Sequence, residues 1–251
     1  MEPIHPQPGS ARDPRHFVGR QDATLTATRR LKDGTSLLLN DPRRMGKTYW
    51  LTYFADRTED FLPIIIDYEG VASRDSFLLR TVDALRKNQG LGPTFKTWLR
   101  AWFDNTDTEI GAGPLSVKVA LQHQPSAKIL EQTLAAVAEK APRTVLICMD
   151  EVPLAILAIA RNEGPASARE LLETLRLLRQ GQANIRWIMA GSVGFHHVLA
   201  ECQTTPGDLN DLDNLHLGPL TESEAAELAT RLVLGIGATG TPQIIGRLVE
   251  R

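Results

Sequence analysis

The sequence predicts an α/β protein built around a parallel sheet. Short aliphatic runs alternate along the chain with longer segments whose apolar residues recur every three or four positions. Several strand candidates, such as 145–147, are apolar without interruption, which is typical of strands that helices cover on both faces. The repeated helix–strand order favours a doubly wound sheet. The expected strands are residues 36–40, 63–67, 144–150, 185–190 and 214–217.

The helices between these strands are predicted from apolar stripes. Leu78, Val82 and Leu85 recur at the spacing that places side chains on one face of a helix. After residue 219 the pattern becomes purely helical, and Thr221 with Glu224 forms a capping box that opens a helix. Two further stripes consist of Leu130, Leu134 and Val137, and of Leu171, Leu175 and Leu178.

These patterns divide the chain into three parts and an insert. Residues 1–15 contain four prolines and are expected to form a flexible arm. Residues 16–218 would form the core, and residues 219–251 a helical lid that begins without finishing. Residues 90–126 are rich in glycine and proline and read as an insert with a hairpin or edge strand at 115–121. Trp98 and Trp102 are expected to form its core.

Composition excludes several classes of protein. Lys plus Arg total 28 and Asp plus Glu total 30, so the net charge of −2 excludes a basic coat for nucleic acid, although not a local basic patch. The longest apolar run, 154–160, is too short to span a membrane. The N-terminus has no apolar signal region, and two cysteines cannot form a disulfide framework. We therefore expect a cytoplasmic protein with no membrane partner.

The strongest functional signal lies in residues 37–48, where a strand, a loop and a helix follow one another. Gly46, Lys47 and Thr48 open the helix, where backbone N–H groups and the helix dipole favour a bound phosphate. Lys47 would reach the β- and γ-phosphates, and Thr48 would ligate Mg²⁺. Asp41 stands where the motif G-x-x-x-x-G-K-[ST] has its first glycine. Its carboxylate would repel a triphosphate unless it points away or caps the loop.

Two further strand ends carry candidate catalytic groups. The strand 144–150 ends in Asp150 and is followed by Glu151. In this arrangement the first acid would hold Mg²⁺ through its shell of bound water, and the second would orient and polarise the attacking water as general base. Ser192 follows the strand 185–190 and could touch the γ-phosphate or that water. A solvated strand end and an ordinary Gly-Ser turn are the alternatives. The candidate catalytic residues are Glu151, Lys47 and Ser192, and the candidate metal ligands are Thr48 and Asp150.

Together these residues resemble the P-loop ATPases of the AAA+/STAND superfamily, especially those of the archaeal ATPase type. The resemblance covers roughly residues 16–250. Further matching segments are 16–20, 191–192 and 240–242. It implies a three-layer core with a parallel five-stranded sheet in the order 5-1-4-3-2, followed by a partial all-α lid, with ATP and Mg²⁺ as cofactors. The residues it places around the nucleotide are Asp41, Pro42, Arg43, Arg44, Met45, Gly46, Lys47, Thr48 and Tyr49, together with Val18, Gly19, Arg20 and Pro242.

The distribution of cations bears on the expected activity. Residues 188–229 contain no arginine or lysine, so this stretch cannot supply a cation to the γ-phosphate on a neighbouring subunit. Arg43 and Arg44 could contact phosphate, reach a partner subunit or remain solvated. Three arginines before residue 188 could act only through a different geometry: Arg176, Arg179 and Arg186.

The predicted function is a slow ATP hydrolase. The resemblance implies that its nucleotide state switches conformation and controls self-association or assembly with a partner protein. Two alternatives remain open. The first is an AAA+ ATPase that remodels or loads on DNA, a partner that the net charge does not support. The second is a module that binds nucleotide without hydrolysing it.

Overall fold

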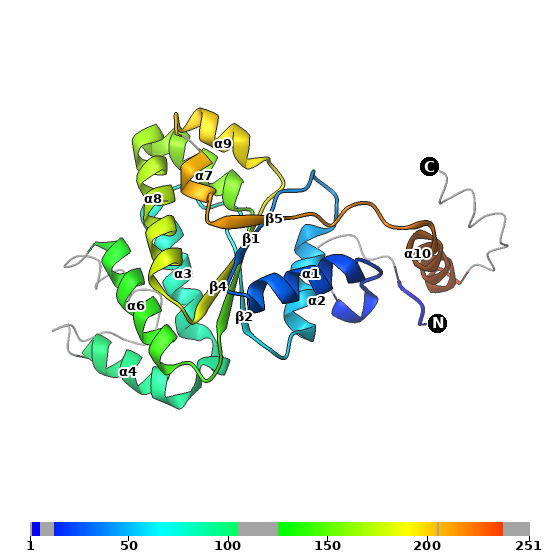
Figure 1. The fold of residues 1–251 in the computed structure, drawn as a ribbon, viewed down its shortest axis with the longest axis horizontal. Coiled ribbons are helices and arrows are strands. Elements are labelled where there is room, and N and C mark those ends of the chain that lie inside the picture. The colour runs from blue at the N-terminus through cyan, green and yellow to red at the C-terminus, as the bar shows by residue number, and fades with distance from the viewer. Residues whose placement is uncertain (1, 6–12, 105–124, 205, 238–251) are drawn as a thin grey trace.

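The computed structural model describes residues 2–5, 13–104, 125–204 and 206–237, arranged as a sheet between two helical layers (Figure 1). The strands are β1 (Ser36–Leu39), β2 (Leu62–Asp67), β3 (Val145–Asp150), β4 (Ile185–Ala190) and β5 (Leu212–Leu215). The α-helices are α1 (Gln21–Lys32), α2 (Lys47–Arg57), α3 (Arg74–Lys87), α4 (Gly92–Asp104), α6 (Ser126–Lys140), α7 (Val152–Glu163), α8 (Pro165–Gly181), α9 (Phe195–Glu201) and α10 (Glu222–Gly235). Short 3₁₀ helices are η1 (Pro14–His16), η2 (Gln89–Leu91) and η3 (Pro206–Leu209).

The sheet is entirely parallel, with the strand order β2-β3-β4-β1-β5. Read from the other edge this is 5-1-4-3-2, so the predicted fold class is confirmed. The fifth strand lies two residues earlier than the predicted 214–217, because Leu212 pairs with Ser36 and Leu215 with Leu39. All five strands point the same way, so the loops that follow them gather at the carboxyl ends of the strands, which form one edge of the sheet.

Each face of the sheet is covered by its own apolar core. On one face, α1 and α2 contribute Leu31, Trp50 and Phe54, which are almost completely buried against the strands. The other face is covered by α3, α6, α7, α8 and α9, which lie together on the opposite side in Figure 1. The three predicted helical stripes are confirmed, since all nine residues are buried: Leu78, Val82, Leu85, Leu130, Leu134, Val137, Leu171, Leu175 and Leu178.

The start of α7 packs closely against Gly191, the residue that follows β4. Glu151 precedes this helix in a left-handed conformation (φ 56°), and Pro153 occupies its first turn, where a missing N–H costs nothing. A Cβ at Gly191, which follows β4, would lie 2.2 Å from Cδ of Pro153. Only glycine fits this position, and its presence brings the next residue, Ser192, next to Glu151.

The predicted insert is described only in its first part. Residues 89–104 form η2 and α4, and Trp98 stacks on Phe95 with ring centroids 5.8 Å apart while packing against the main core. The predicted hairpin at 115–121 and the side chain of Trp102 lie outside the described residues.

The last described helix, α10, lies to one side of the sheet and its helical layers, next to residues 2–5 (Figure 1). Its capping box is confirmed, since Thr221 and Glu224 each accept the backbone N–H of the other. The N–H of Ile4 donates to the carbonyl of Arg231 at 2.9 Å, so residues 2–5 contact this helix. The proposed division at residues 15 and 218 stays a prediction. Within the described ranges, no helix has both the length and the apolar character that a membrane span requires.

Candidate functional site

The loop between β1 and α2 encloses the side chain of Lys47. The Lys47 ammonium donates to the carbonyl oxygens of Asp41 at 2.5 Å and Pro42 at 2.6 Å, and the residue is only 6% exposed. Arg44 (φ 70°) and Gly46 (φ 81°) adopt left-handed conformations that curl the loop toward the start of α2. Burial lowers the pKa of Lys47, against the opposing effect of the Asp41 carboxylate.

The side chain of Asp41 is turned away from this loop. One carboxylate oxygen accepts the backbone N–H of Leu217 at 3.0 Å, and the other lies 3.5 Å from Nδ1 of His216. Asp41, which stands where the motif has its first glycine, therefore links residues 41–48, here called the phosphate loop, to the segment that follows β5. The sequence left two possibilities, a carboxylate that points away from the loop or one that caps it. In the structure the carboxylate points away.

Replacing Asp41 by alanine should destabilise the fold. Both Asp41 and Leu217 are buried, so the variant leaves the Leu217 N–H without its acceptor, at a cost of about 1–3 kcal/mol in the free energy of unfolding. Urea denaturation followed by circular dichroism measures this loss. Asp41→Asn keeps an acceptor oxygen and should recover most of it. Equal stability of the alanine variant and the unmodified protein would contradict the assigned contact.

Thr48 and Asp150 meet where β3 ends beside α2. The Asp150 carboxylate accepts the N–H of Glu151 at 3.0 Å, and the Thr48 hydroxyl lies beside this carboxylate. Asp150 is 2% exposed, and burial raises its pKa, with the Thr48 hydroxyl acting against that rise. A hydroxyl oxygen and a carboxylate, both suitable ligands for a hard cation, thus lie side by side at this strand end.

Glu151 and Ser192 form a second contact at the same edge. Oε2 of Glu151 accepts both the hydroxyl of Ser192 at 2.8 Å and its backbone N–H at 3.1 Å. The carboxylate is therefore held by two donors from the end of β4. The structure brings together the predicted residues Lys47, Thr48, Asp150, Glu151 and Ser192 from three strand ends.

Residues 17–20, which lead into α1, begin with an aromatic contact to α2. Phe17 stacks on Tyr53 with centroids 4.6 Å apart and meets Tyr49 edge to face at 5.3 Å. Val18 is buried, and Gly19 and Arg20 lead into α1. This arrangement places the predicted residues Val18, Gly19, Arg20 and Tyr49 close to the phosphate loop. Pro242 lies outside the described residues.

The remaining loop residues and the arginines fall into separate groups. Pro42, Arg43 and Arg44 are exposed and Met45 is half-buried. The buried guanidinium of Arg179, in α8, donates to the Asp211 carboxylate at 2.7 and 2.8 Å and to the Asp208 carbonyl at 2.7 Å. Arg186 donates to carbonyl groups at the amino end of β4, the edge opposite the phosphate loop. Neither Arg179 nor Arg186 lies next to the phosphate loop of its own chain.

Sequence reasoning missed the partner of Arg20. The Arg20 N–H donates to Glu224 in α10 at 2.9 Å, although 204 residues separate them. Glu224 was recognisable as the third residue of a capping box, which explains its bond to Thr221 but carries no information on a distant partner. A hollow of about 460 Å³ lies between the starts of α1 and α10 next to this contact.

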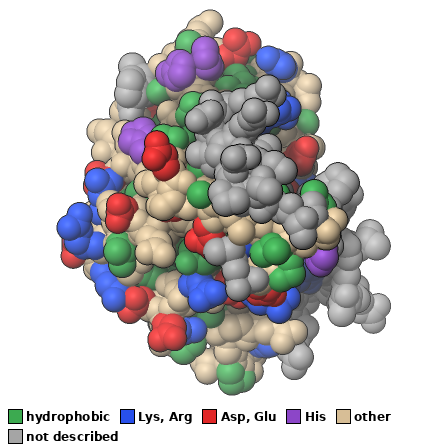
Figure 2. All heavy atoms as spheres, turned by 90° about the vertical axis from the view of Figure 1, so that its right-hand side faces the viewer, with side chains coloured by type: hydrophobic (Ala, Val, Ile, Leu, Met, Phe, Trp, Pro, Cys, Tyr) green, Lys and Arg blue, Asp and Glu red, His purple; other side chains and the backbone are tan. Residues whose placement is uncertain are grey.

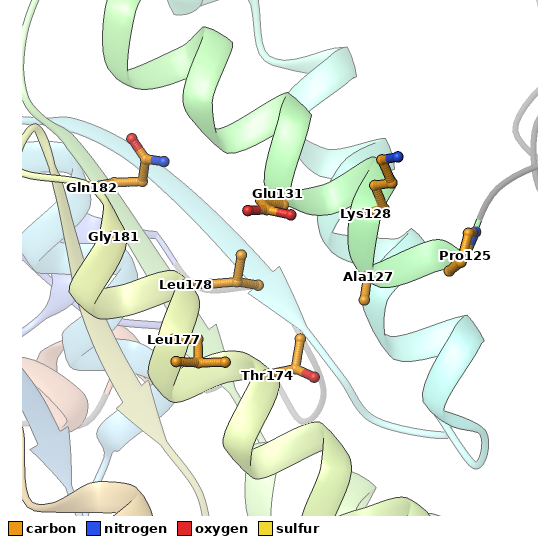
Figure 3. A pocket seen from close by; sticks show the side chains of 9 residues that line it. All are labelled: Pro125, Ala127, Lys128, Glu131, Thr174, Leu177, Leu178, Gly181 and Gln182. Carbon is orange, nitrogen blue, oxygen red and sulfur yellow. The ribbon is translucent and has the colours of Figure 1, made fainter.

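A second hollow, of about 400 Å³, lies between α6 and α8 on the far side of the sheet from α1 and α2. In Figure 3 Lys128 and Glu131 of α6 lie across from Thr174, Leu177 and Leu178 of α8. Its lining contains no residue of the phosphate loop or of the strand ends. It therefore takes no part in the candidate site.

The donors at the β3 end fit magnesium better than a softer metal. Among the described residues no group of three His, Cys, Asp or Glu side chains is arranged to hold a metal. A hydroxyl and a carboxylate are typical of Mg²⁺ sites that take their other ligands from water and phosphate oxygens. Thr48 and Asp150 would hold the ion together with a bound triphosphate.

Comparison with known proteins identifies the fold. No protein-family model and no curated protein sequence matches the chain. A Walker-type ATPase of Pyrococcus abyssi matches with a TM-score of 0.66 and 15% identity, over 97% of this chain and 66% of that one. The Aeropyrum pernix ORC2 protein, in complexes with ADPNP and ADP, gives 0.53 and 15% over 92% and 54%. The Aeropyrum pernix ORC1 protein, in complex with DNA, gives 0.50 and 14% over 86% and 49%.

At these identities the likeness establishes the fold. The chain has the α/β P-loop fold of these proteins, with the strand order that the resemblance in its sequence predicted. It spans about half to two thirds of the length of these three proteins.

Proposed function

We propose that the chain binds ATP with Mg²⁺ at the phosphate loop and hydrolyses it slowly. We further propose that its nucleotide state controls the position of α10 and thereby assembly with itself or with a partner protein. The observation that carries the proposal is the meeting of Lys47, the Thr48–Asp150 pair and the Glu151–Ser192 pair at one edge of the sheet. A lysine, two oxygen donors and a candidate base are the groups that γ-phosphate transfer to water requires.

Binding would begin with an exchange of partners at Lys47. Its ammonium would leave the carbonyl oxygens of Asp41 and Pro42 for phosphate oxygens. The N–H groups at the start of α2 would add donors at the positive end of the helix dipole. The turned-away carboxylate of Asp41 supports this reading, because it leaves no negative side chain inside the loop.

Hydrolysis would depend on Glu151 and Ser192. When bound, Mg²⁺ supplies positive charge that offsets the charge of the phosphates in the transition state. The Glu151 carboxylate would accept a proton from the attacking water. Ser192 is a positioning residue in this scheme, because it holds the carboxylate through its hydroxyl and its N–H.

Ser192→Ala should lower kcat by about tenfold or more, because the base loses the hydroxyl bond that helps to orient it and keeps only the backbone N–H. KM for ATP should change little, since the variant touches the base and not the phosphate loop. Steady-state phosphate release measures both constants. Ser192→Thr keeps the hydroxyl and should restore much of kcat. An unchanged kcat in the alanine variant would exclude this positioning role.

The proposal is tested first by phosphate release from Mg-ATP, with ATP affinity measured by equilibrium titration. We expect micromolar to millimolar binding and turnover well below the ~10 s⁻¹ that is the median for enzymes. Tight binding with no turnover would replace the hydrolase by a module that only holds nucleotide. Absence of binding would overturn the proposal as a whole.

A second candidate is an ATPase that loads on or remodels DNA. It is favoured by the similarity to the ORC1 protein of Aeropyrum pernix, whose structure was solved in complex with DNA. Charge argues against it on the face that carries α10, where positive and negative side chains are interspersed among the coloured residues (Figure 2). Stimulation of hydrolysis by DNA, with a steep loss at higher salt, would support this candidate over the switch.

A further inference from the structure

The side chain of Arg20 contacts both the phosphate loop and the segment between β5 and α10. Its guanidinium donates to the carbonyl of Leu217 at 2.9 Å and lies 3.5 Å from the carbonyl of Met45. Met45 belongs to the phosphate loop and directly precedes Gly46. Leu217 belongs to the segment that leads from β5 to α10. One side chain therefore contacts both the loop and the approach to the helix.

The backbone of Arg20 is held by α10 itself. Arg20 precedes α1 in a left-handed conformation (φ 64°) and gives that helix no side-chain cap. Its N–H donates to Oε1 of Glu224 at 2.9 Å, while Oε2 of the same carboxylate accepts the N–H of Thr221 at 2.8 Å. Glu224 thus places its negative charge at the N-termini of both α1 and α10, where it is favoured by both helix dipoles.

The contact between the two helix starts is closely fitted. A Cβ at Gly19 would lie 2.6 Å from Cδ of Glu224 and 2.9 Å from Cδ2 of Leu220. Gly19 also has φ 77°, a conformation that other residues rarely adopt. A glycine here lets the backbone approach the carboxylate, which makes the bond from the neighbouring Arg20 N–H geometrically possible.

Space around this contact would allow α10 to move. The hollow of about 460 Å³ between α1 and α10 is lined mainly by polar groups, including Glu224 and Glu227. The first turns of α10 therefore do not share an apolar core with α1 that a movement would have to break. Farther along the helix, Arg231 donates to the carbonyls of Glu2 and Arg15, so α10 has a second attachment to the N-terminal segment.

We propose that Arg20 and Glu224 form a link through which occupancy of the phosphate loop sets the position of α10. This inference rests on the proposed function, because it assumes that a nucleotide binds the loop. Lys47 must give up the Asp41 and Pro42 carbonyls to reach a phosphate, and that exchange rearranges the loop that contains Met45. The Arg20 guanidinium transmits the change to the Leu217 carbonyl, and its backbone transmits it to Glu224. Both residues are positioning residues.

Hydrogen exchange on the full chain, with and without Mg-AMP-PNP, tests the link. In the unmodified protein we expect nucleotide to protect residues 41–48 and to change exchange across α10. In Glu224→Ala the loop should still be protected, while the change in α10 should shrink about fivefold or more. Arg231 keeps α10 attached in this variant. Glu224→Gln retains an acceptor for the Arg20 N–H and should recover most of the response.

A matched control is Glu222→Ala, which removes the same charge from the exposed first turn of α10 without touching Arg20. Its α10 response should equal that of the unmodified protein. Faster exchange in Glu224→Ala with an undiminished nucleotide response would mean that Glu224 only stabilises the helix, and would overturn the link. Protection of the loop without any response of α10 in the unmodified protein would overturn it as well. Failure to protect the loop at all would instead refute nucleotide binding.

Discussion

Glu151→Gln should bind Mg-ATP with nearly unchanged affinity but should hydrolyse it at least about 100-fold more slowly. Glutamine has almost the shape of glutamate and can still accept a hydrogen bond from Ser192, so the edge of the site should keep its geometry. It cannot accept a proton from the attacking water. Phosphate release and equilibrium titration with a fluorescent ATP analogue measure the two quantities separately.

The control for this substitution is Glu173→Gln, which removes an exposed carboxylate from α8, away from the site. It should leave both binding and turnover unchanged. Turnover by Glu151→Gln at the rate of the unmodified protein would show that another group activates water, and the assigned base would be wrong. If this variant lost ATP binding, the substitution would have disturbed the phosphate loop, and its low turnover would not report on the role of Glu151 in the reaction.

Lys47→Ala should lose measurable ATP binding, with affinity reduced by about 100-fold or more. A lysine that donates to phosphate oxygens makes charge-assisted hydrogen bonds, and its removal also leaves the triphosphate without the nearest positive charge. The same titration measures the effect. Thermal unfolding of the variant must be followed in parallel, because the carbonyls of Asp41 and Pro42 lose their donor as well.

Lys87→Ala provides the comparison, since this lysine is 67% exposed and pairs with Asp83 on the surface of α3. ATP affinity should be unaffected by its removal. If a folded Lys47→Ala protein bound ATP as tightly as the unmodified chain, the phosphate loop would not be the nucleotide site. That outcome would remove the basis for every later step of the proposed mechanism.

The sheet and its order were predictable because the local signals agree with one another. Uninterrupted aliphatic runs marked β1, β2 and β3, and the buried stripes of α3, α6 and α8 had helical spacing. The fifth strand was misplaced by two residues, because Leu215 and Leu217 are both buried and the sequence does not show which one pairs with β1. Leu217 instead gives its N–H to Asp41.

The candidate site was predictable in its parts and less so in its connections. Motif spacing identified Lys47, Asp150 and Glu151, because these groups lie at strand ends and helix starts that the fold gathers at one edge. It did not reveal that Asp41 points toward β5 or that Arg20 bonds to Glu224. Such contacts join residues more than 170 positions apart, and their directions depend on packing. The roles of Pro242 and of the hairpin at 115–121 stay predictions.

The most direct test of the nucleotide switch is the solution mass of Glu151→Gln, measured by light scattering in Mg-ATP and again in Mg-ADP. The substitution should hold the protein in its ATP-bound form for the duration of the measurement. We expect a larger assembly in Mg-ATP and its dissociation in Mg-ADP. Equal masses in the two nucleotides, with binding of both confirmed by titration, would contradict a switch that controls assembly of this chain with itself.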